Sequence, residues 1–175
     1  MKTNSLILML ALSAALAFTA SPTHAQLYVT TVNNDVGEYN ATTGATINST
    51  LVTGQSNPYG LALSGNNLYV VNYISGGVGE YNATTGSPIN ANFITGLHGP
   101  SAIAISGNDL FVANAGGNTV GEYNATTGAA INSNFITGVS GPGGLAIASP
   151  VPEPTGILTG LLCLGLATVR RRRSA

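Results

Sequence analysis

The chain has 175 residues, and only 6 % of them are charged. All five basic residues lie at the ends, as Lys2 and Arg170 to Arg173, so residues 26–169 contain no lysine or arginine. A surface without cations cannot neutralise phosphates, which argues against nucleic acid as a partner. The single cysteine, Cys163, also lies near the C-terminus, so the predicted folded part has neither a disulfide nor a thiol site.

The N-terminal 25 residues have the pattern of a secretory signal. Lys2 precedes an apolar run from Leu6 to Ala20, and Thr23 and Ala25 place small residues at the two positions that determine cleavage. The apolar run is short for a membrane-spanning helix. We therefore expect a signal peptide, cleaved between Ala25 and Gln26.

Residues 26–149 contain three copies of one unit. The segment 36–44, Val-Gly-Glu-Tyr-Asn-Ala-Thr-Thr-Gly, recurs letter for letter as 78–86 and 120–128, at a spacing of 42 residues. Self-similarity at this period, combined with strand-like composition, is typical of stacked β-units. We therefore treat residues 26–149 as one repeat domain.

Each unit is predicted to hold four short antiparallel strands. In the second unit, 61–63 is apolar, a Gly-Asn turn follows, and 68–72 is rich in aromatic and β-branched residues. The Val-Gly-Glu-Tyr-Asn strand and a more polar last strand, 89–94, complete the unit. The first strand of the unit, 61–63, is apolar on both faces, so we expect it to be buried on both faces. Four strands in about 42 residues match one blade of a β-propeller.

The blade cores resemble those of YVTN-type and NHL-type propellers. The similarity is carried by Gly99 to Asn114, with its Pro-x-x-Ile-Ala pattern, turn and Leu-Phe-Val-x-Asn strand, and by Leu68 to Asn72. It covers Leu27 to Ala148 and implies an all-β, β-propeller-like fold. Propellers of these types serve as binding platforms, lyases and surface proteins, so the resemblance leaves the function open.

The number of strands leaves two arrangements open. The first unit lacks its inner strand, and the last residues of the domain, 144–149, supply an inner strand alone, so together they would complete a third four-stranded blade. Three blades are fewer than the four to eight of common propellers. Either the array closes by itself, through pairing of Leu145–Ala148 with Leu27–Thr30, or two copies form a six-bladed homodimer.

The C-terminal segment, residues 150–175, resembles the PEP-CTERM sorting signal. A Val-Pro-Glu-Pro motif, an apolar run from Thr155 to Val169 and an arginine cluster follow one another in that order. Fifteen apolar residues at 1.5 Å each span about 22 Å, less than the ~30 Å core of a bilayer, which fits a transient anchor. Arginines stay on the cytoplasmic side, so the repeats would lie outside. The motif consists of Val151, Pro152, Glu153, Pro154, Arg170, Arg171, Arg172 and Arg173.

The resemblance implies that an exosortase-type protease holds and cuts this segment near Pro152-Glu153-Pro154. The protein would then reach the cell surface or extracellular matrix of a Gram-negative bacterium, after transient anchoring in the inner membrane by the C-terminal helix. An ordinary tail anchor would explain the arginines but not the Pro-Glu-Pro motif.

The sequence predicts no catalytic, cofactor or metal residues, and hence no enzyme. His98 is the one histidine after residue 25, lies in a predicted turn and has no counterpart in the other repeats. We expect a structural, adhesive or glycan-binding role, with exopolysaccharide or other glycans as partners. The alternative is a hydrolase or lyase whose site is assembled across blades.

Two residue types recur once per blade. Glu38, Glu80 and Glu122 are expected to face solvent rather than to converge on a cation. The repeated tyrosines are expected to pack between neighbouring blades, although they could instead stack on sugar rings. These tyrosines are Tyr39, Tyr81 and Tyr123.

Overall fold

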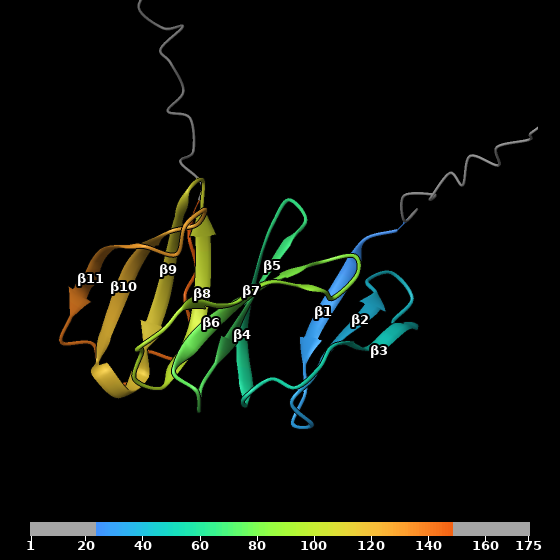
Figure 1. Cartoon of the computed structure of the whole chain (residues 1–175), viewed down its shortest axis with the longest axis horizontal. Helices are drawn as coiled ribbons and strands as arrows, with labels where there is room; N and C mark the ends of the chain where they lie inside the picture. Colours follow the sequence, from blue (N-terminus) through green and yellow to red (C-terminus); the bar gives the residue numbers. More distant parts are fainter. Residues whose placement is uncertain (1–23, 149–175) are drawn as a thin grey trace, which may run out of the picture. The chain divides into compact units, whose positions relative to one another are not determined.

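The computed structural model describes residues 24–148, whose regular elements are β-strands and one short 3₁₀ helix (Figure 1). The predicted sorting segment lies outside the described residues. So does the predicted signal peptide, except for its last two residues. Within 24–148, no helix is long and apolar enough to cross a membrane. The elements are β1 (Gln26–Thr30), β2 (Val36–Asn40), β3 (Thr46–Val52), β4 (Pro58–Ser64), β5 (Asn67–Asn72), β6 (Gly77–Asn82), β7 (Pro88–Ile94), β8 (Pro100–Ser106), β9 (Asp109–Asn114), the short 3₁₀ helix η1 (Ala115–Gly117), β10 (Thr119–Asn124) and β11 (Ala130–Thr137).

The strands form three antiparallel sheets, each built from consecutive segments of the chain. Blade 1 has the order β1-β2-β3, blade 2 has β4-β5-β6-β7, and blade 3 has β8-β9-β10-β11. The prediction of four strands is therefore confirmed for blades 2 and 3 and wrong for blade 1. Blade 1 has three strands because the segment that matches its missing inner strand lies at the far end of the domain, where residues 138–148 form no strand.

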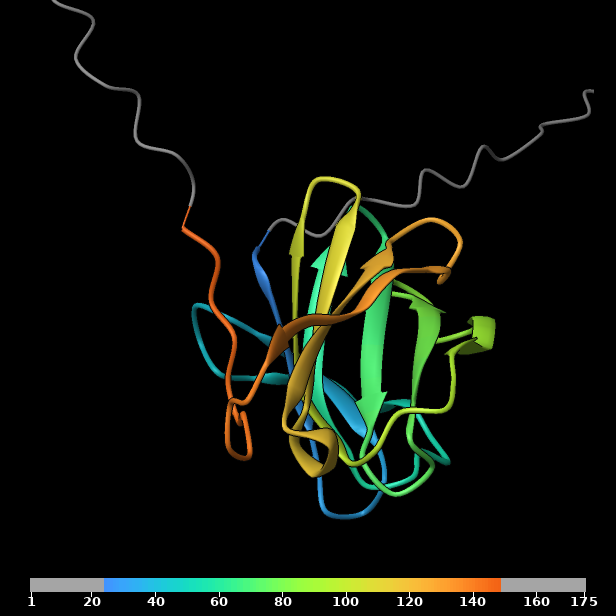
Figure 2. The same ribbon diagram turned by 90° about the vertical axis from the view of Figure 1, so that its left-hand side faces the viewer.

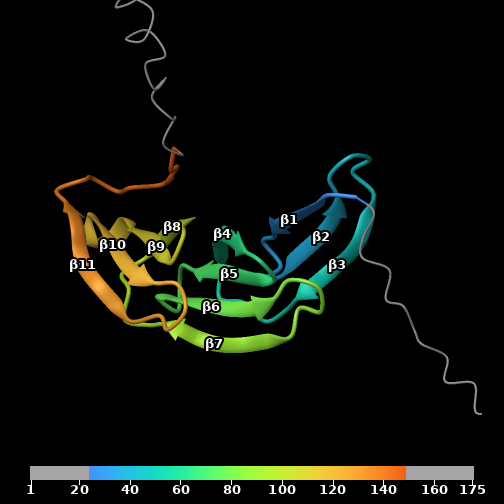
Figure 3. The same cartoon turned by 90° about the horizontal axis from the view of Figure 1, so that it is seen from above.

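The blades follow one another side by side, with their inner strands on one edge of the array and their outer strands on the other (Figure 3). The inner strand β4 lies between β1 and β8 and contacts both. Seen from the side of blade 3, that blade lies in front of the other two (Figure 2). Blade 2 thus has one face toward blade 1 and the other toward blade 3.

The core lies between the blades rather than inside one of them. One cluster joins blades 1 and 2 and another joins blades 2 and 3. Because side chains alternate along a strand, β5 contributes to both: Leu68 and Val70 pack toward blade 1, whereas Tyr69 and Val71 pack toward blade 3. The expectation that 61–63 would be buried on both faces is wrong, because β4 is the edge strand of its sheet and Leu63 stays 47 % exposed.

One polar contact recurs at both blade interfaces. The hydroxyl of Tyr28 donates to the carbonyl of Ala83 at 3.2 Å, and that of Tyr69 donates to the carbonyl of Ala125 at 2.7 Å. The turn that carries each of these carbonyls also presses its glycine onto the outer strand of the preceding blade. A Cβ at Gly86 would lie 1.8 Å from the Leu51 oxygen, and one at Gly128 would lie 2.1 Å from the Phe93 oxygen.

The repeated glutamates do not all face solvent, which corrects the prediction. Glu38 and Glu80 are 4 % and 6 % exposed, because the face of each blade that carries them is covered by the next blade. An amide reaches each carboxylate: Gln26 donates to Glu38, and the Asn67 Nδ2 donates to the Glu80 Oε1 at 2.8 Å. Glu122, on the outer face of blade 3, is half-buried.

Burial raises the pKa of the Glu80 carboxyl above its ordinary value, and the neighbouring Tyr69 side chain only partly opposes this shift. Folding therefore favours the protonated form of Glu80. Its contribution to stability is fully present below the pKa of the unfolded chain, and it is lost as the pH rises through the raised pKa of the folded chain.

We expect Glu80→Gln to raise the free energy of unfolding at pH 7, because glutamine keeps the shape and the amide contact without the buried charge. The gain should shrink toward pH 4, where the wild-type carboxyl is largely protonated. Urea unfolding at both pH values measures this gain in the free energy of unfolding. Glu122→Gln is the control, because it makes the same substitution at a half-buried glutamate. A Glu80→Gln variant that is less stable than wild type by the same amount at both pH values would contradict this account.

Candidate ligand-binding surface

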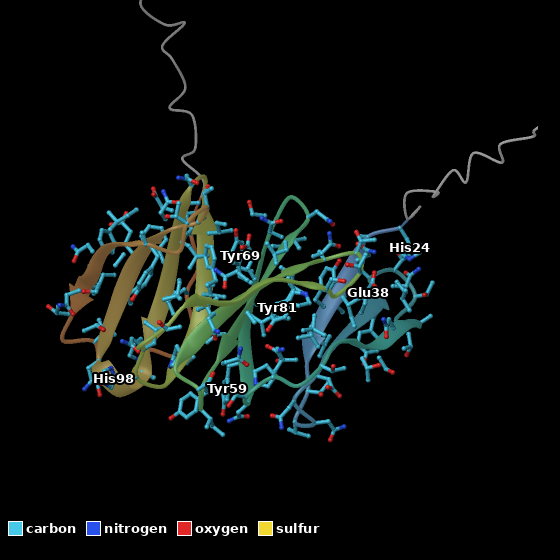
Figure 4. The ribbon with its side chains drawn as sticks, viewed as in Figure 1. His24, Glu38, Tyr59, Tyr69, Tyr81 and His98 are labelled. Atoms are coloured by element: carbon cyan, nitrogen blue, oxygen red, sulfur yellow. The ribbon has the colours of Figure 1, made fainter. Side chains whose placement is uncertain are left out.

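An exposed aromatic pair stands out on the described surface. Tyr59 lies on β4 and Tyr73 directly follows β5; their ring centroids are 5.2 Å apart and the rings are tilted by 38°. The two side chains are 53 % and 40 % exposed, and Figure 4 shows Tyr59 at the edge of the array that carries His98. Large aromatic side chains held in the open offer flat apolar surface next to a hydroxyl group.

Backbone contacts hold this pair in place. The Tyr73 amide donates to the Asn57 carbonyl at 3.1 Å, and the next amide, that of Ile74, donates to the Ser56 carbonyl at 3.2 Å. A Cβ at Gly99 would lie 3.1 Å from the Tyr73 ring, so the ring rests against the backbone that leads into blade 3. The aromatic surface is therefore positioned before any ligand arrives.

A hollow of about 310 Å³ lies beside Tyr59, where the end of β1 meets the start of β4. Its polar groups are neutral, and the Thr30 hydroxyl is anchored by donating to the Tyr59 carbonyl at 3.2 Å. A concave site with an aromatic wall and a few neutral polar groups suits an uncharged, hydroxyl-rich ligand. The lining residues are Thr30, Thr31, Val32, Asn57, Pro58 and Tyr59.

The outer strands add a second polar surface, repeated in every blade. In β3, β7 and β11, an exposed asparagine accepts from the backbone amide two residues later at 3.1 Å, and the pairing of each strand with its neighbour shifts register in this region. The same neutral groups are thus displayed three times along the array. These asparagines are Asn48, Asn90 and Asn132.

The repeated tyrosines serve mainly as packing residues, as expected. Tyr81 and Tyr123 are 6 % and 5 % exposed, and burial raises the pKa of Tyr123. The Tyr81 hydroxyl exchanges hydrogen bonds with the Gln55 side chain at 3.0 and 3.1 Å. Tyr39, on the outer face of blade 1, is half-buried.

His98 lies in an exposed turn, and its backbone amide donates to the Asn114 Oδ1 at 2.7 Å. Among residues 24–148, no three His, Cys, Asp or Glu side chains gather closely enough to hold a metal ion. The structure does not bring the repeated glutamates together, since each lies on the sheet of its own blade.

Sequence reasoning missed the Tyr59–Tyr73 pair because it concentrated on residues shared by the repeats. In the repeat alignment, Tyr59 corresponds to Ser101 and Tyr73 corresponds to Ala115. Aromatic residues at positions where the third copy carries small residues were the available signal. Their contact requires the β4–β5 hairpin to bring both positions to one end of the blade.

No protein-family model and no curated protein matches the chain. Similarity appears among solved structures. The computationally designed protein Ika4 is 16 % identical over 74 % of this chain and 84 % of its own, with a TM-score of 0.57. Hydrazine synthase of Kuenenia stuttgartiensis is 25 % identical over 63 % of this chain, with a TM-score of 0.55. AztD of Citrobacter koseri is 11 % identical over 67 % of this chain, with a TM-score of 0.51.

This chain spans 32 % of the hydrazine synthase chain and 34 % of the AztD chain, about a third of each natural neighbour. It likewise covers 39 % of the designed protein Ika8, to which it is similar with a TM-score of 0.58. The natural neighbours are β-propeller-like proteins. The described part of this chain therefore has a β-propeller-like fold of three antiparallel sheets.

Proposed function

We propose that this protein is an exported, non-enzymatic β-propeller-like protein that binds neutral glycans at the cell surface or in the exopolysaccharide. The observation that supports this most strongly is the Tyr59–Tyr73 pair beside the uncharged hollow of about 310 Å³. An aromatic face can stack on the apolar face of a sugar ring, while threonine and asparagine groups exchange hydrogen bonds with its hydroxyls.

The charge distribution supports the same ligand class. Residues 26–148 carry no lysine or arginine, so an anionic ligand would find no cation there. The exposed asparagines of the outer strands present the same neutral groups once per blade. Such a repeated surface suits a polymer whose own units repeat, because weak contacts add along it.

The terminal segments supply the destination in this proposal. The signal peptide would direct export, and the Val151-Pro152-Glu153-Pro154 motif, apolar run and arginines would engage an exosortase-type protease. The transient hold in the inner membrane would end with cleavage and release of the repeat domain to the surface. The composition and the resemblance of these segments support this part of the proposal.

For glycan binding, we expect the full chain, purified in mild detergent, to bind neutral glycans on an array. Tyr59→Ala and Tyr73→Ala should each weaken that binding about tenfold or more, a loss of about 1.4 kcal/mol. Leu63→Ala is the matched control, because Leu63 lies on the same strand β4 as Tyr59 and is 47 % exposed but does not line the hollow. Binding to no glycan, or binding that neither tyrosine variant changes, would contradict the proposal, and turnover of a bound glycan would favour the hydrolase or lyase alternative.

For sorting, we expect Glu153→Ala to leave the protein in the inner membrane with its arginine cluster, because the protease would lose the acidic residue of its motif. Cell fractionation and intact mass measure both properties, with Ser149→Ala as a control just outside the motif. Release of the Glu153→Ala variant at the wild-type rate and with the wild-type mass would contradict cleavage of this segment by an exosortase-type protease.

A further inference from the structure

The first and last blades each have a sheet face that no other described blade covers. The outer face of blade 1 carries Leu27 and Val29, which are 50 % and 39 % exposed. In blades 2 and 3, the corresponding leucines and valines are at most 1 % exposed. We call this the tail face; it consists of Leu27, Val29 and Tyr39.

The outer face of blade 3, which we call the head face, consists of Phe111, Phe135 and Ile136. Phe111 and Phe135 repeat the Tyr69–Phe93 pair of blade 2, with ring centroids 5.3 Å apart instead of 5.4 Å. Phe93 is 6 % exposed because blade 3 covers it, whereas Phe135 is 47 % exposed. The head face therefore has the same design as the face on which a further blade is already seated within this chain.

The internal interfaces show what fits these faces. Between blades 1 and 2, and again between blades 2 and 3, a face of the head type packs on a face of the tail type. By the repeat, the partner that the head face of blade 3 requires is a tail face like that of blade 1. A second copy of this chain offers that face with the same residues.

After β11, the chain continues with a segment that corresponds to the inner strand of a further blade. Pro142 to Ala148 corresponds to β8, yet it forms no strand, and its start is anchored where the Ser101 hydroxyl donates to the Pro142 carbonyl at 2.6 Å. In blade 3, the inner strand pairs with the next strand through the register Ile103 to Val112. The same register places Leu145 opposite Val29, on the unpaired edge of β1.

We propose that two copies assemble head to tail, and that residues 142–148 of each copy form the inner strand of blade 1 of the other. Closed propellers have about four to eight blades, and six is the only multiple of three in that range, so the ring contains two chains. The head face of each copy packs on the tail face of the other. This is a heterologous contact, and the ring closes after two copies. The head face, the tail face and the β1 edge are all covered in this assembly.

Gly44 provides an independent indication. Its equivalents Gly86 and Gly128 lie so close to the preceding blade that a Cβ would be within 1.8 and 2.1 Å of a carbonyl oxygen, whereas nothing lies within 4 Å of a Cβ at Gly44. In the assembly, Gly44 lies against the Phe135 carbonyl of the second copy. A side chain at position 44 therefore blocks the assembly without touching the rest of its own chain.

The interface between copies lacks one contact that both internal interfaces have. Phe111 stands where Tyr28 and Tyr69 donate a hydroxyl to the next blade, so the Ala41 carbonyl of the second copy receives no such bond. Phe111→Tyr supplies the missing donor. It lowers the dissociation constant of the dimer several-fold if the interface between copies repeats the internal one.

Cysteine cross-linking tests the strand exchange on the full chain in mild detergent, with Cys163→Ser as the background. One preparation carries Val29→Cys, a second carries Leu145→Cys, and a third carries both. Oxidation of the mixed single variants yields a covalent dimer, which neither variant yields alone. A cross-link only within the double variant would mean that the chain covers its own β1, and the absence of a cross-link in the mixture would likewise overturn the proposal.

Sedimentation equilibrium in density-matched detergent tests the contact faces with a separate pair of variants. Gly44→Asn should be monomeric, because asparagine tolerates a positive φ, as Asn34, Asn57 and Asn118 do here, but blocks the Phe135 carbonyl. Gly65→Asn is the matched control, since Gly65 also has a positive φ and nothing within 4 Å of a Cβ. Wild type and Gly65→Asn should both have the mass of two chains. A monomeric wild type, a larger oligomer, or a Gly44→Asn variant that still dimerises would refute the two-chain ring.

Discussion

Each sheet of this protein is apolar on both of its faces, and a sheet of that kind can be buried only between two others. The second strand of blade 2 shows the constraint most clearly, because Leu68 and Val70 fill one interface while Tyr69 and Val71 fill the other. Burying a side chain of this size stabilises the fold by about 1.5–3 kcal/mol, so the stacking of blades contributes most of the driving force. A blade on its own would keep half of that surface in water.

The same constraint explains why buried polar groups recur at the interfaces. A carboxylate on the covered face of a blade loses its water, and Glu80 is tolerated there with an amide donor beside it and a raised pKa. The tyrosine hydroxyls that reach the next blade each use a carbonyl in a turn, which fixes the position of that turn relative to the preceding sheet. Packing and polar contacts thus select the same stacking geometry.

Much of the fold could be predicted from the sequence, because the repeat and its turns are local signals. The Gly-Asn turn predicted after residues 61–63 begins at Gly65, which has the positive φ, 57°, that such a turn requires. The burial of Glu38 and Glu80 could not be predicted, since it depends on the neighbouring blade and not on the strand that carries the residue. The half-exposed β4 was missed for a related reason: an apolar strand at the edge of a sheet lacks a partner on one side.

The candidate site was less predictable than the fold. The residues that are identical in the three repeats form the scaffold. Tyr59 and Tyr73 differ from their repeat equivalents, and they come into contact only after the β4–β5 hairpin forms. In a repeat array, positions that differ among copies are free of the shared packing requirement. They are therefore the positions at which a binding surface can be built without disturbing the stack.

The central claim, that stability arises between blades, is tested most directly by comparing two isoleucines on one strand. Ile94 of β7 is 4 % exposed within the cluster between blades 2 and 3, whereas Ile89 of the same strand is 53 % exposed. Urea unfolding should show a loss of about 2–5 kcal/mol for Ile94→Ala and less than about 1 kcal/mol for Ile89→Ala. Equal losses for the two variants would contradict the account.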